Sequence, residues 1–173
     1  MAKTKNEIAW KKLSPEAFAV YGTFARMTAP AGPRLGEPPV EFFRDMIQCG
    51  FPAGQASSYS ICRVARRPFV IDVSEYHDAC SEIVMPLDGD ILMHVAPAGP
   101  QKEFPAASAE VFLVPRGTLC VARPGVWHHA PFAFDCEVVN CLIVLPERTY
   151  SNDCKVWVLP KKDHVRIVGD GTR

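Results

Sequence analysis

Residues 74–89 carry the densest group of side chains suited to acid–base or metal chemistry. Glu75 and His77 are two positions apart, and Glu82 follows after a short connection. If a strand ends at His77, Glu75 and His77 share one face, because alternate side chains of a strand point the same way; a hairpin would then return Glu82 toward the pair. Two carboxylates and an imidazole around one cavity can hold a divalent metal or divide the roles of acid and base. The alternative is a polar barrel mouth whose side chains satisfy one another.

A second stretch, residues 117–129, offers another histidine next to a turn. Gly117 is followed by Gly125, and His128 comes shortly after Gly125. A strand, a tight turn and a second strand would bring His128 to the same barrel mouth as Glu75. His129 would point to the opposite side of an extended chain, so one of the two adjacent histidines is expected to be structural.

The elements that would position these groups are mostly strands. From residue 57 onward, short apolar runs alternate with turn residues, and Asp88-Gly89 is typical of a hairpin turn. We expect strands over residues 58–64, 68–73, 81–87, 90–96, 111–114, 118–122, 128–131, 137–145 and 155–159. The pattern predicts one all-β domain over residues 1–173, an antiparallel barrel whose mouth is open to a small ligand.

The N-terminal segments are predicted to lie outside this barrel. Ser14-Pro15-Glu16 is typical of a helix start, so a short helix should run to Tyr21 and end at Gly22. Residues 1–12 are interpreted as a loosely attached leader. Residues 28–39, rich in proline and glycine, are interpreted as an irregular segment that wraps the barrel surface.

Charge and hydropathy argue against several classes of partner. Nineteen basic and nineteen acidic residues cancel, and no basic stripe appears, so we expect no nucleic-acid partner. No apolar run approaches the roughly 20 residues that span a bilayer, so no membrane partner is expected. The charged start lacks the apolar centre of a signal peptide, which favours a cytoplasmic location.

The seven cysteines lack the spacing of a zinc knuckle or a regular disulfide framework. Cys62, Cys120 and Cys141 lie in apolar runs and are interpreted as small core residues in a reducing compartment. Cys80 and Cys154 lie next to the candidate site segments, and the sequence alone assigns neither of them a role.

Together the two stretches resemble the paired motifs of the cupin superfamily. The second histidine, the glutamate and the final glycine of the first motif are matched by His77, Glu82 and Gly89. The second motif is matched by Gly117, Gly125 and His128. Three positions depart from the motifs: Glu75 for the first histidine, Arg123 for a proline and Phe132 for an asparagine. The resemblance implies a cupin-type, jelly-roll-like β-barrel with a short N-terminal helix.

Most of the chain further resembles the ureidoglycolate lyase family within this superfamily. The resemblance is carried, in order, by residues 13–18, 21–22, 60–63, 75–77 and 151–154. Its most specific part is Val126-Trp127-His128-His129 with Phe132-Ala133, which matches the family's W-H-H-x-x-F-A signature. Arg123 stands where the family often has histidine. The resemblance implies cleavage of ureidoglycolate to glyoxylate and urea in allantoin and purine breakdown.

The implied reaction needs a base, an acid or metal, and a cation for the substrate carboxylate. Four residues are expected to be catalytic: Glu75, His77, Glu82 and His128. Three of these are candidate ligands of a divalent nickel, manganese, iron or zinc ion: His77, Glu82 and His128. Three more are expected to contact the substrate: Arg63, His129 and Arg123. Arg63 is the preferred carboxylate clamp, since guanidinium offers a forked pair of donors; its alternative role is an exposed ion pair.

Two other functions remain open at this point. One is a different metal-dependent cupin enzyme, such as an isomerase or oxygenase, which the replacement of the first cupin histidine by Glu75 disfavours. The other is a non-catalytic barrel that binds a small molecule. Because the resembling family forms dimers, and a partner can cover exposed barrel edges, a homodimer is expected.

Overall fold

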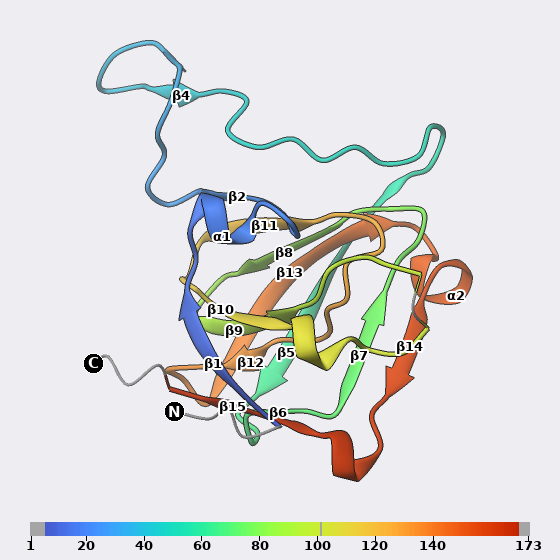
Figure 1. The fold of residues 1–173 in the computed structure, drawn as a ribbon. Helices are drawn as coiled ribbons and strands as arrows, with labels where there is room; N and C mark the ends of the chain where they lie inside the picture. Colours follow the sequence, from blue (N-terminus) through green and yellow to red (C-terminus); the bar gives the residue numbers. More distant parts are fainter. Residues whose placement is uncertain (1–5, 101, 170–173) are drawn as a thin grey trace.

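Two curled β-sheets face each other and form the body of the protein (Figure 1). The computed structural model describes residues 6–100 and 102–169. The first sheet has the strand order β12 (Phe132–Ala133), β9 (Ile91–Val95), β10 (Glu110–Val114), β1 (Glu7–Lys12), β15 (Val165–Val168) and β6 (Val70–Ile71). The second has the order β2 (Gly22–Arg26), β11 (Thr118–Ala122), β8 (Glu82–Pro86), β13 (Val138–Pro146) and β5 (Ser57–Ala65).

The remaining elements are short. Two strand pairs stand beside the main sheets: β14 (Lys155–Val158) with β7 (Val73–Tyr76), and β3 (Arg34–Leu35) with β4 (Phe42–Phe43). The described helical segments are α1 (Pro15–Phe18), α2 (Thr149–Asn152) and the 3-10 turns η1 (Ala106–Ser108) and η2 (Lys161–Asp163). The predicted all-β barrel is confirmed, and α1 is the short N-terminal helix. The strand pairing of the barrel is not antiparallel throughout, because β1 runs parallel to both of its neighbours.

Most expected strands form, with two differences around the site. The single strand expected over residues 68–73 is divided into β6 and β7. The strand expected over residues 128–131 is absent; Trp127 and His128 instead make isolated bridges to Ala96 and Glu75. The alternation of residue types therefore located the strands but not the places where pairing is interrupted.

Strand β9 separates two apolar cores because all its residues are buried and alternate between its faces. Ile91, Met93 and Val95 belong to the core between the two sheets, where they meet residues of β8, β10, β11 and β13. Leu92 belongs to a second core on the other side, which the segment around Phe104 and the C-terminal strands cover. Because β9 is buried on both faces, it is a rigid support for the neighbouring bridge between Ala96 and Trp127.

Helix α1 begins where the sequence predicts and ends earlier. The Ser14 side chain accepts a hydrogen bond from the Ala17 amide at 3.2 Å, and a proline occupies the first turn. The helix ends at Phe18 rather than at Tyr21. Phe18 is fully buried and packs edge-on against Phe112, with ring centroids 5.4 Å apart. This aromatic contact fixes the helix against the barrel.

The interpretation of residues 1–12 as a loose leader is wrong from Glu7 onward. Strand β1 lies inside the first sheet, parallel to both β10 and β15. Its Ile8 and Trp10 pack against the second core, and these two apolar residues in a charged segment were too few to predict a strand. Residues 1–5 lie outside the described part of the chain.

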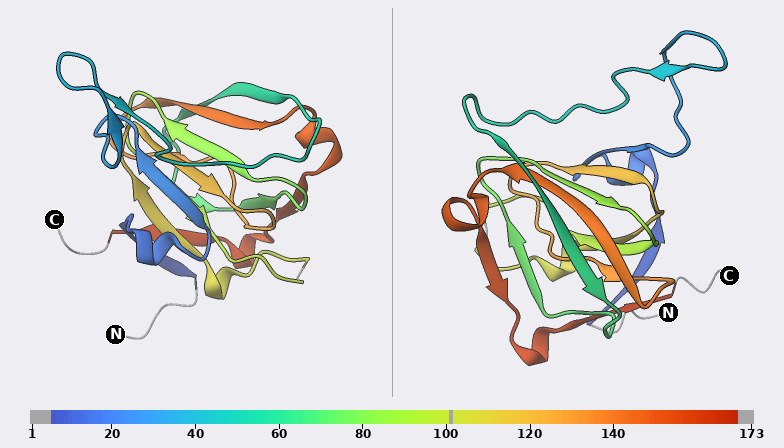
Figure 2. Two further views of the ribbon diagram at one scale, coloured as in Figure 1. Left: turned by 90° about the horizontal axis from the view of Figure 1, so that it is seen from above. Right: turned by 180° about the vertical axis from the view of Figure 1, so that it is seen from behind.

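The proline- and glycine-rich residues 28–39 do not wrap the barrel. They form part of an exposed arm that leaves the body near β2, carries the β3–β4 pair and returns to β5 (Figures 1 and 2). Val40 and Phe42 of this arm are exposed. Most residues of the arm are exposed, so it contributes little to the apolar cores.

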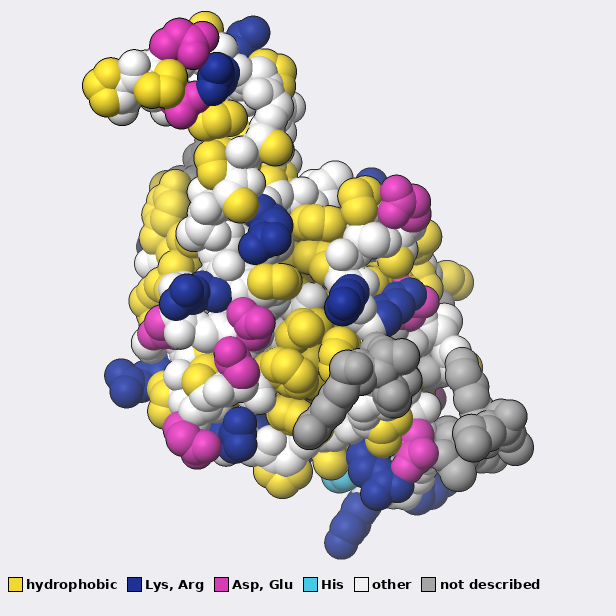
Figure 3. Space-filling view, turned by 90° about the vertical axis from the view of Figure 1, so that its left-hand side faces the viewer, with side chains coloured by type: hydrophobic (Ala, Val, Ile, Leu, Met, Phe, Trp, Pro, Cys, Tyr) yellow, Lys and Arg dark blue, Asp and Glu magenta, His cyan; other side chains and the backbone are white. Residues whose placement is uncertain are grey.

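The surface mixes charges of both signs. On the face drawn in Figure 3, basic and acidic side chains are interspersed among apolar ones. This matches the equal numbers of basic and acidic residues in the sequence. Within residues 6–100 and 102–169, no helix has the length and apolar character needed to cross a membrane.

Candidate active site

The site begins with a bridge between the two motifs. The Glu75 amide donates to the His128 carbonyl at 2.6 Å, and the His128 amide donates to the Glu75 carbonyl at 2.8 Å. Residues directly opposite each other in an antiparallel pair project their side chains to the same side. The bridge therefore sets the Glu75 carboxylate beside the His128 imidazole.

Gly125 makes the turn that delivers His128. Its amide donates to the His77 carbonyl at 2.7 Å, and its φ of +78° lies in the left-handed region that glycine adopts without strain. A Cβ at this position would come within 2.9 Å of the Ala98 Cβ. The glycine of the second motif is thus required both by its conformation and by the close approach of the neighbouring loop.

A buried serine and histidine support the bridge from behind. The Ser74 hydroxyl donates to the His128 carbonyl at 3.1 Å and lies 3.2 Å from the His94 Nε2. Burial lowers the pKa of His94 well below 6.5, with smaller contributions from nearby cations, so this imidazole is neutral and its Nε2–H donates to Ser74. His94 is thus a packed residue of β9.

Two imidazoles converge on one carboxylate at the centre of the site. The Nε2 atoms of His77 and His128 each lie 3.0 Å from the Glu82 Oε2. The three side chains are at most about 6% exposed, so water does not screen these contacts. The structure therefore brings His77, Glu82 and His128 together, and the Glu75 carboxylate lies within 4.8 Å of the two imidazoles.

Backbone carbonyls orient both rings. The His77 Nδ1 lies 2.6 Å from the Asp153 carbonyl, and the His128 Nδ1 lies 2.8 Å from the Val126 carbonyl. A carbonyl oxygen only accepts, so both Nδ1 atoms carry the hydrogen. Both Nε2 atoms are therefore the ones presented to Glu82 and to any ligand.

The buried carboxylate and His128 form an ion pair. Burial would raise the pKa of Glu82, but the charge and hydrogen bond of His128, with a smaller contribution from His77, lower it from 4.5 to about 2. Burial would lower the pKa of His128, but attraction and hydrogen bonding to Glu82, with help from the Val126 carbonyl and Glu75, raise it to about 9. The group is thus built to hold a carboxylate and an imidazolium at neutral pH.

The same side chains fit a divalent metal. Glu75, His77 and His128 each offer a ligand atom, and these atoms lie within 4.8 Å of one another. The two Nδ1 atoms already donate to carbonyls, which is the arrangement that fixes metal-ligating imidazoles. This set differs from the sequence prediction in one member, because Glu75 joins the two histidines while Glu82 contacts both of their Nε2 atoms.

Two arginines expected at the substrate lie elsewhere. Arg63 is exposed on β5, where the adjacent Cys62 and Val64 take the more buried positions on the opposite face. The Arg123 guanidinium donates to the Ala19 carbonyl at 2.6 Å and so caps the end of α1. The expectation that these two cations line the cavity is corrected, because strand alternation turns Arg63 outward and α1 holds Arg123.

His129 stays close to the site, although it is not part of the central group. It is half-buried, and burial lowers its pKa while the charge of Glu75 acts in the opposite direction. The half-buried Arg67 donates to the Ala130 and Pro131 carbonyls and packs over the Phe132 ring, so it fixes the segment that follows His129.

Sequence reasoning missed the part of the site supplied by the segment after β13. Tyr150 of α2 contacts the His77 ring edge-on at a centroid distance of 6.2 Å. Asp153 and Cys154 contact His77 and Glu75 directly. The sequence signals were the position of Cys154 next to a candidate site segment and the resemblance of residues 151–154 to a polar family segment, and neither carried information about contacts.

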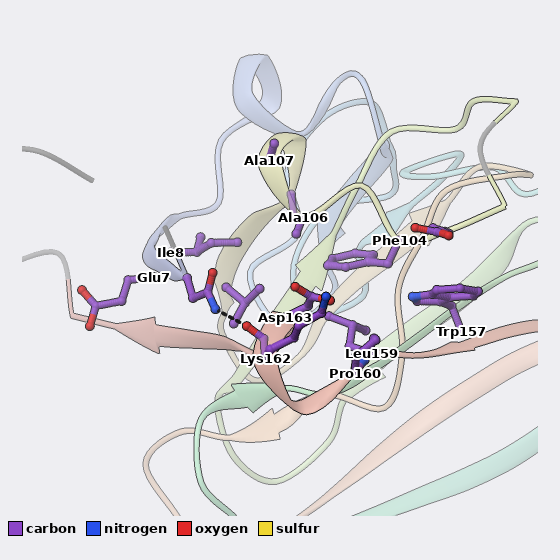
Figure 4. A pocket seen from close by; sticks show the side chains of 14 residues that line it. Glu7, Ile8, Phe104, Ala106, Ala107, Trp157, Leu159, Pro160, Lys162 and Asp163 are labelled. Carbon is purple, nitrogen blue, oxygen red and sulfur yellow. Dashed lines mark hydrogen bonds between the residues drawn. The ribbon is translucent and has the colours of Figure 1, made fainter. Parts of the chain in front are cut away.

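A separate cavity of about 770 Å³ lies on the outer side of the first sheet (Figure 4). Its wall includes Ile8, Phe104, Trp157, Lys162 and Asp163. No residue of the Glu75–His77–Glu82–His128 group lines it. This cavity therefore does not coincide with the titratable group, and the chemistry points to the histidine site.

Fold and site define an all-β protein with a buried histidine and carboxylate centre. The Ureidoglycolate lyase family model matches residues 5–166, so the chain belongs to the ureidoglycolate lyase family. A search of curated proteins found no match.

Similarity to solved structures is low. An oxalate decarboxylase is 14% identical over 76% of this chain and 35% of its own, with a TM-score of 0.42. A Bacillus subtilis oxalate decarboxylase variant is 15% identical over the same shares, with a TM-score of 0.40. RmlC from Streptococcus suis, in complex with dTDP-D-xylose, is 12% identical over 66% of this chain and 61% of its own, with a TM-score of 0.38. The chain spans about a third of the length of the oxalate decarboxylases (35%).

Proposed function

We propose that the protein is a lyase that cleaves ureidoglycolate to glyoxylate and urea in the breakdown of allantoin and purines. The observation that carries the proposal is the convergence of the His77 and His128 Nε2 atoms on Glu82, with Glu75 beside them, in a chain of the ureidoglycolate lyase family. The site unites an acid, a base and candidate metal ligands, which are the groups that this elimination needs.

The reaction breaks one carbon–nitrogen bond and moves two protons. A base takes the proton of the substrate hydroxyl, and the oxygen–hydrogen electron pair forms the second bond of the glyoxylate carbonyl. The electron pair of the broken carbon–nitrogen bond stays on the urea nitrogen, which takes a proton from an acid. The step balances without an oxidant or a reductant.

The charges of the site support an assignment of these roles. His128, with a pKa of about 9, carries a proton near neutral pH and is the proposed acid. Glu82, with a pKa of about 2, is a weak base and stabilises the imidazolium instead. Glu75 is half-buried beside His128 and is the proposed base for the hydroxyl proton. His129 remains the proposed contact for the substrate carboxylate.

A divalent metal is a second way to use the same atoms. Bound by Glu75, His77 and His128, it would supply a Lewis acid that polarises the substrate hydroxyl. Imidazole and carboxylate donors suit manganese, iron, nickel or zinc without choosing among them. His77 and His128 would then present neutral Nε2 atoms, which their Nδ1 contacts to carbonyls favour.

The test is glyoxylate formation from ureidoglycolate, measured above the rate without protein, after chelation and after addition of Mn²⁺. We expect turnover by the native protein, its loss in His77→Ala, and its retention in Arg63→Ala. If turnover survives chelation, the two imidazoles act in acid–base catalysis. If turnover requires added Mn²⁺, they act as metal ligands. Absence of glyoxylate under both conditions would overturn the proposal in favour of another cupin reaction or of ligand binding without turnover.

We further propose a homodimer in the cytoplasm. Strand β5 is an edge strand that exposes Tyr59 and Ile61, a surface that a second copy can cover. All seven cysteines are free thiols, as in a reducing compartment. Light scattering at micromolar concentrations tests the dimer, and a monomer mass throughout that range would contradict it.

A further inference from the structure

Asp153 is tied to the connection that follows His77. Its Oδ1 accepts from the Asp78 amide and its Oδ2 from the Ala79 amide, both at 2.8 Å. The Asp153 amide itself donates to the Thr149 carbonyl at 2.7 Å at the end of α2. One side chain therefore fixes the segment after β13 to the connection between β7 and β8. These two strands pair with different partners, so the connection is not the hairpin that the sequence predicted.

The same residue reaches the His77 ring through its backbone. The Asp153 carbonyl lies 2.6 Å from the His77 Nδ1 and accepts its hydrogen. This contact sets the ring so that Nε2 faces Glu82. If the carboxylate did not hold the segment against the connection between β7 and β8, the carbonyl would be free to move away from the ring.

Cys154 makes the corresponding contact to the other member of the motif. Its thiol donates to the Glu75 Oε2 at 3.3 Å. A carboxylate oxygen only accepts in such a contact, so the thiol hydrogen lies between the sulfur and Glu75. Adjacent residues of one segment thus contact Glu75 and His77, which share a face of the chain leaving β7.

We propose that Asp153 and Cys154 are positioning residues for this site: the Asp153 carbonyl, held by its own carboxylate, orients His77, and the Cys154 thiol orients Glu75. The effect of this positioning on catalysis rests on the proposed function, whereas the orientation of the two side chains does not depend on it. Contacts of this kind to metal-ligating side chains are typically worth roughly 10–100-fold in metal affinity or activity.

The first experiment follows the His77 Nδ1–H proton by NMR in metal-free protein, with the signal assigned by its loss in His77→Gln. We expect a slowly exchanging signal in the native protein and its broadening or loss in Asp153→Ala, with a smaller change in Asp153→Asn, which keeps one acceptor oxygen. The matched control is Asp88→Ala, because Asp88 likewise accepts two hydrogen bonds, from the amide and side chain of Asn140. This control should leave the His77 signal unchanged.

The second experiment titrates the same variants with Mn²⁺ by calorimetry. Asp153→Ala should weaken binding by roughly 10–100-fold, whereas Asp88→Ala should bind like the native protein. The NMR signal decides the proposal for Asp153: an unchanged His77 Nδ1–H in both Asp153 variants overturns it, whether or not Mn²⁺ binds. Asp153→Asn keeps this test available if Asp153→Ala does not fold.

Cys154 is tested by a pair of substitutions. Cys154→Ser keeps a donor for Glu75 and should retain native Mn²⁺ affinity and turnover, whereas Cys154→Ala should lower both. Equal behaviour of the two variants would overturn the role of Cys154. Should the native protein fail to cleave ureidoglycolate while the Asp153 variants still lose the His77 signal, the proposed function fails and the positioning role of Asp153 stands.

Discussion

Glu75 and His128 exchange two backbone hydrogen bonds, at 2.6 and 2.8 Å, although they belong to motifs far apart in the sequence. This bridge is the reason that their side chains lie beside each other. A shift of the pairing by one residue would replace His128 with Trp127 or His129 and turn the imidazole to the other face. The register between the Glu75 and His128 segments, which Ser74 and Gly125 support, therefore decides whether the site forms.

Replacement of Glu82 by glutamine should deprotonate His128 at neutral pH. In the native protein the charge of Glu82 is the main effect that raises the pKa of His128 to about 9 against burial. Without that charge, burial should bring the pKa back toward or below 6.5. NMR titration of the His128 ring in metal-free Glu82→Gln measures this, and a pKa that stays near 9 would contradict the ion-pair assignment.

Stability of the metal-free protein should depend on pH through this pair. The pKa of His128 is raised from 6.5 to about 9, so its contribution is complete below pH 6.5 and lost as the pH rises through 9. The pKa of Glu82 is lowered from 4.5 to about 2, so its contribution is complete above pH 4.5 and lost as the pH falls through 2. Both contributions are complete between pH 4.5 and 6.5.

Denaturant unfolding across this pH range checks the linkage. The free energy of unfolding should include a contribution from the pair that is largest between pH 4.5 and 6.5 and that declines on either side. The Glu82→Gln variant should lack much of this dependence, since it removes the carboxylate that couples the two titrations. Identical pH profiles for the native and variant proteins would be incompatible with the prediction.

Replacement of Arg123 by alanine separates a structural role from a substrate contact. Its guanidinium donates to the Ala19 carbonyl, so the variant should lose about 1 kcal/mol of stability from one hydrogen bond. The Michaelis constant for ureidoglycolate should stay at its native value. A several-fold rise in that constant without loss of stability would restore the substrate contact that the sequence suggested.

Replacement of Phe18 by alanine should cost about 3–5 kcal/mol, because a fully buried aromatic ring leaves a cavity behind. The ring packs against Phe112, Tyr21 and Phe24, so the loss should be felt at the contact between α1 and the barrel. Urea unfolding measures the change. The Mn²⁺ affinity of the folded protein should stay at its native value, because none of the aromatic rings that Phe18 contacts belongs to the site.

The sequence by itself determined the strand content, the barrel class and the core of the site. Glu75 and His77 are separated by two positions, so any strand ending at His77 places them on one face. Gly125 required a turn before His128, and the turn is there. The family followed from the order of short motifs, of which the segment around Trp127 was the most specific.

Only the tertiary structure decided which neighbouring residues complete the site and which arginine side chains lie outside it. Arg63 differs from Cys62 only by facing the other side of β5, and local sequence does not say which face of an edge strand meets the cavity. Arg123 is occupied by the end of α1, and Asp153 reaches His77 through a backbone carbonyl. Every residue has a backbone carbonyl, so residue types do not reveal which carbonyl will contact His77. Contacts between segments distant in the chain depend on how the sheets pack together, so the sequence pattern does not predict them either.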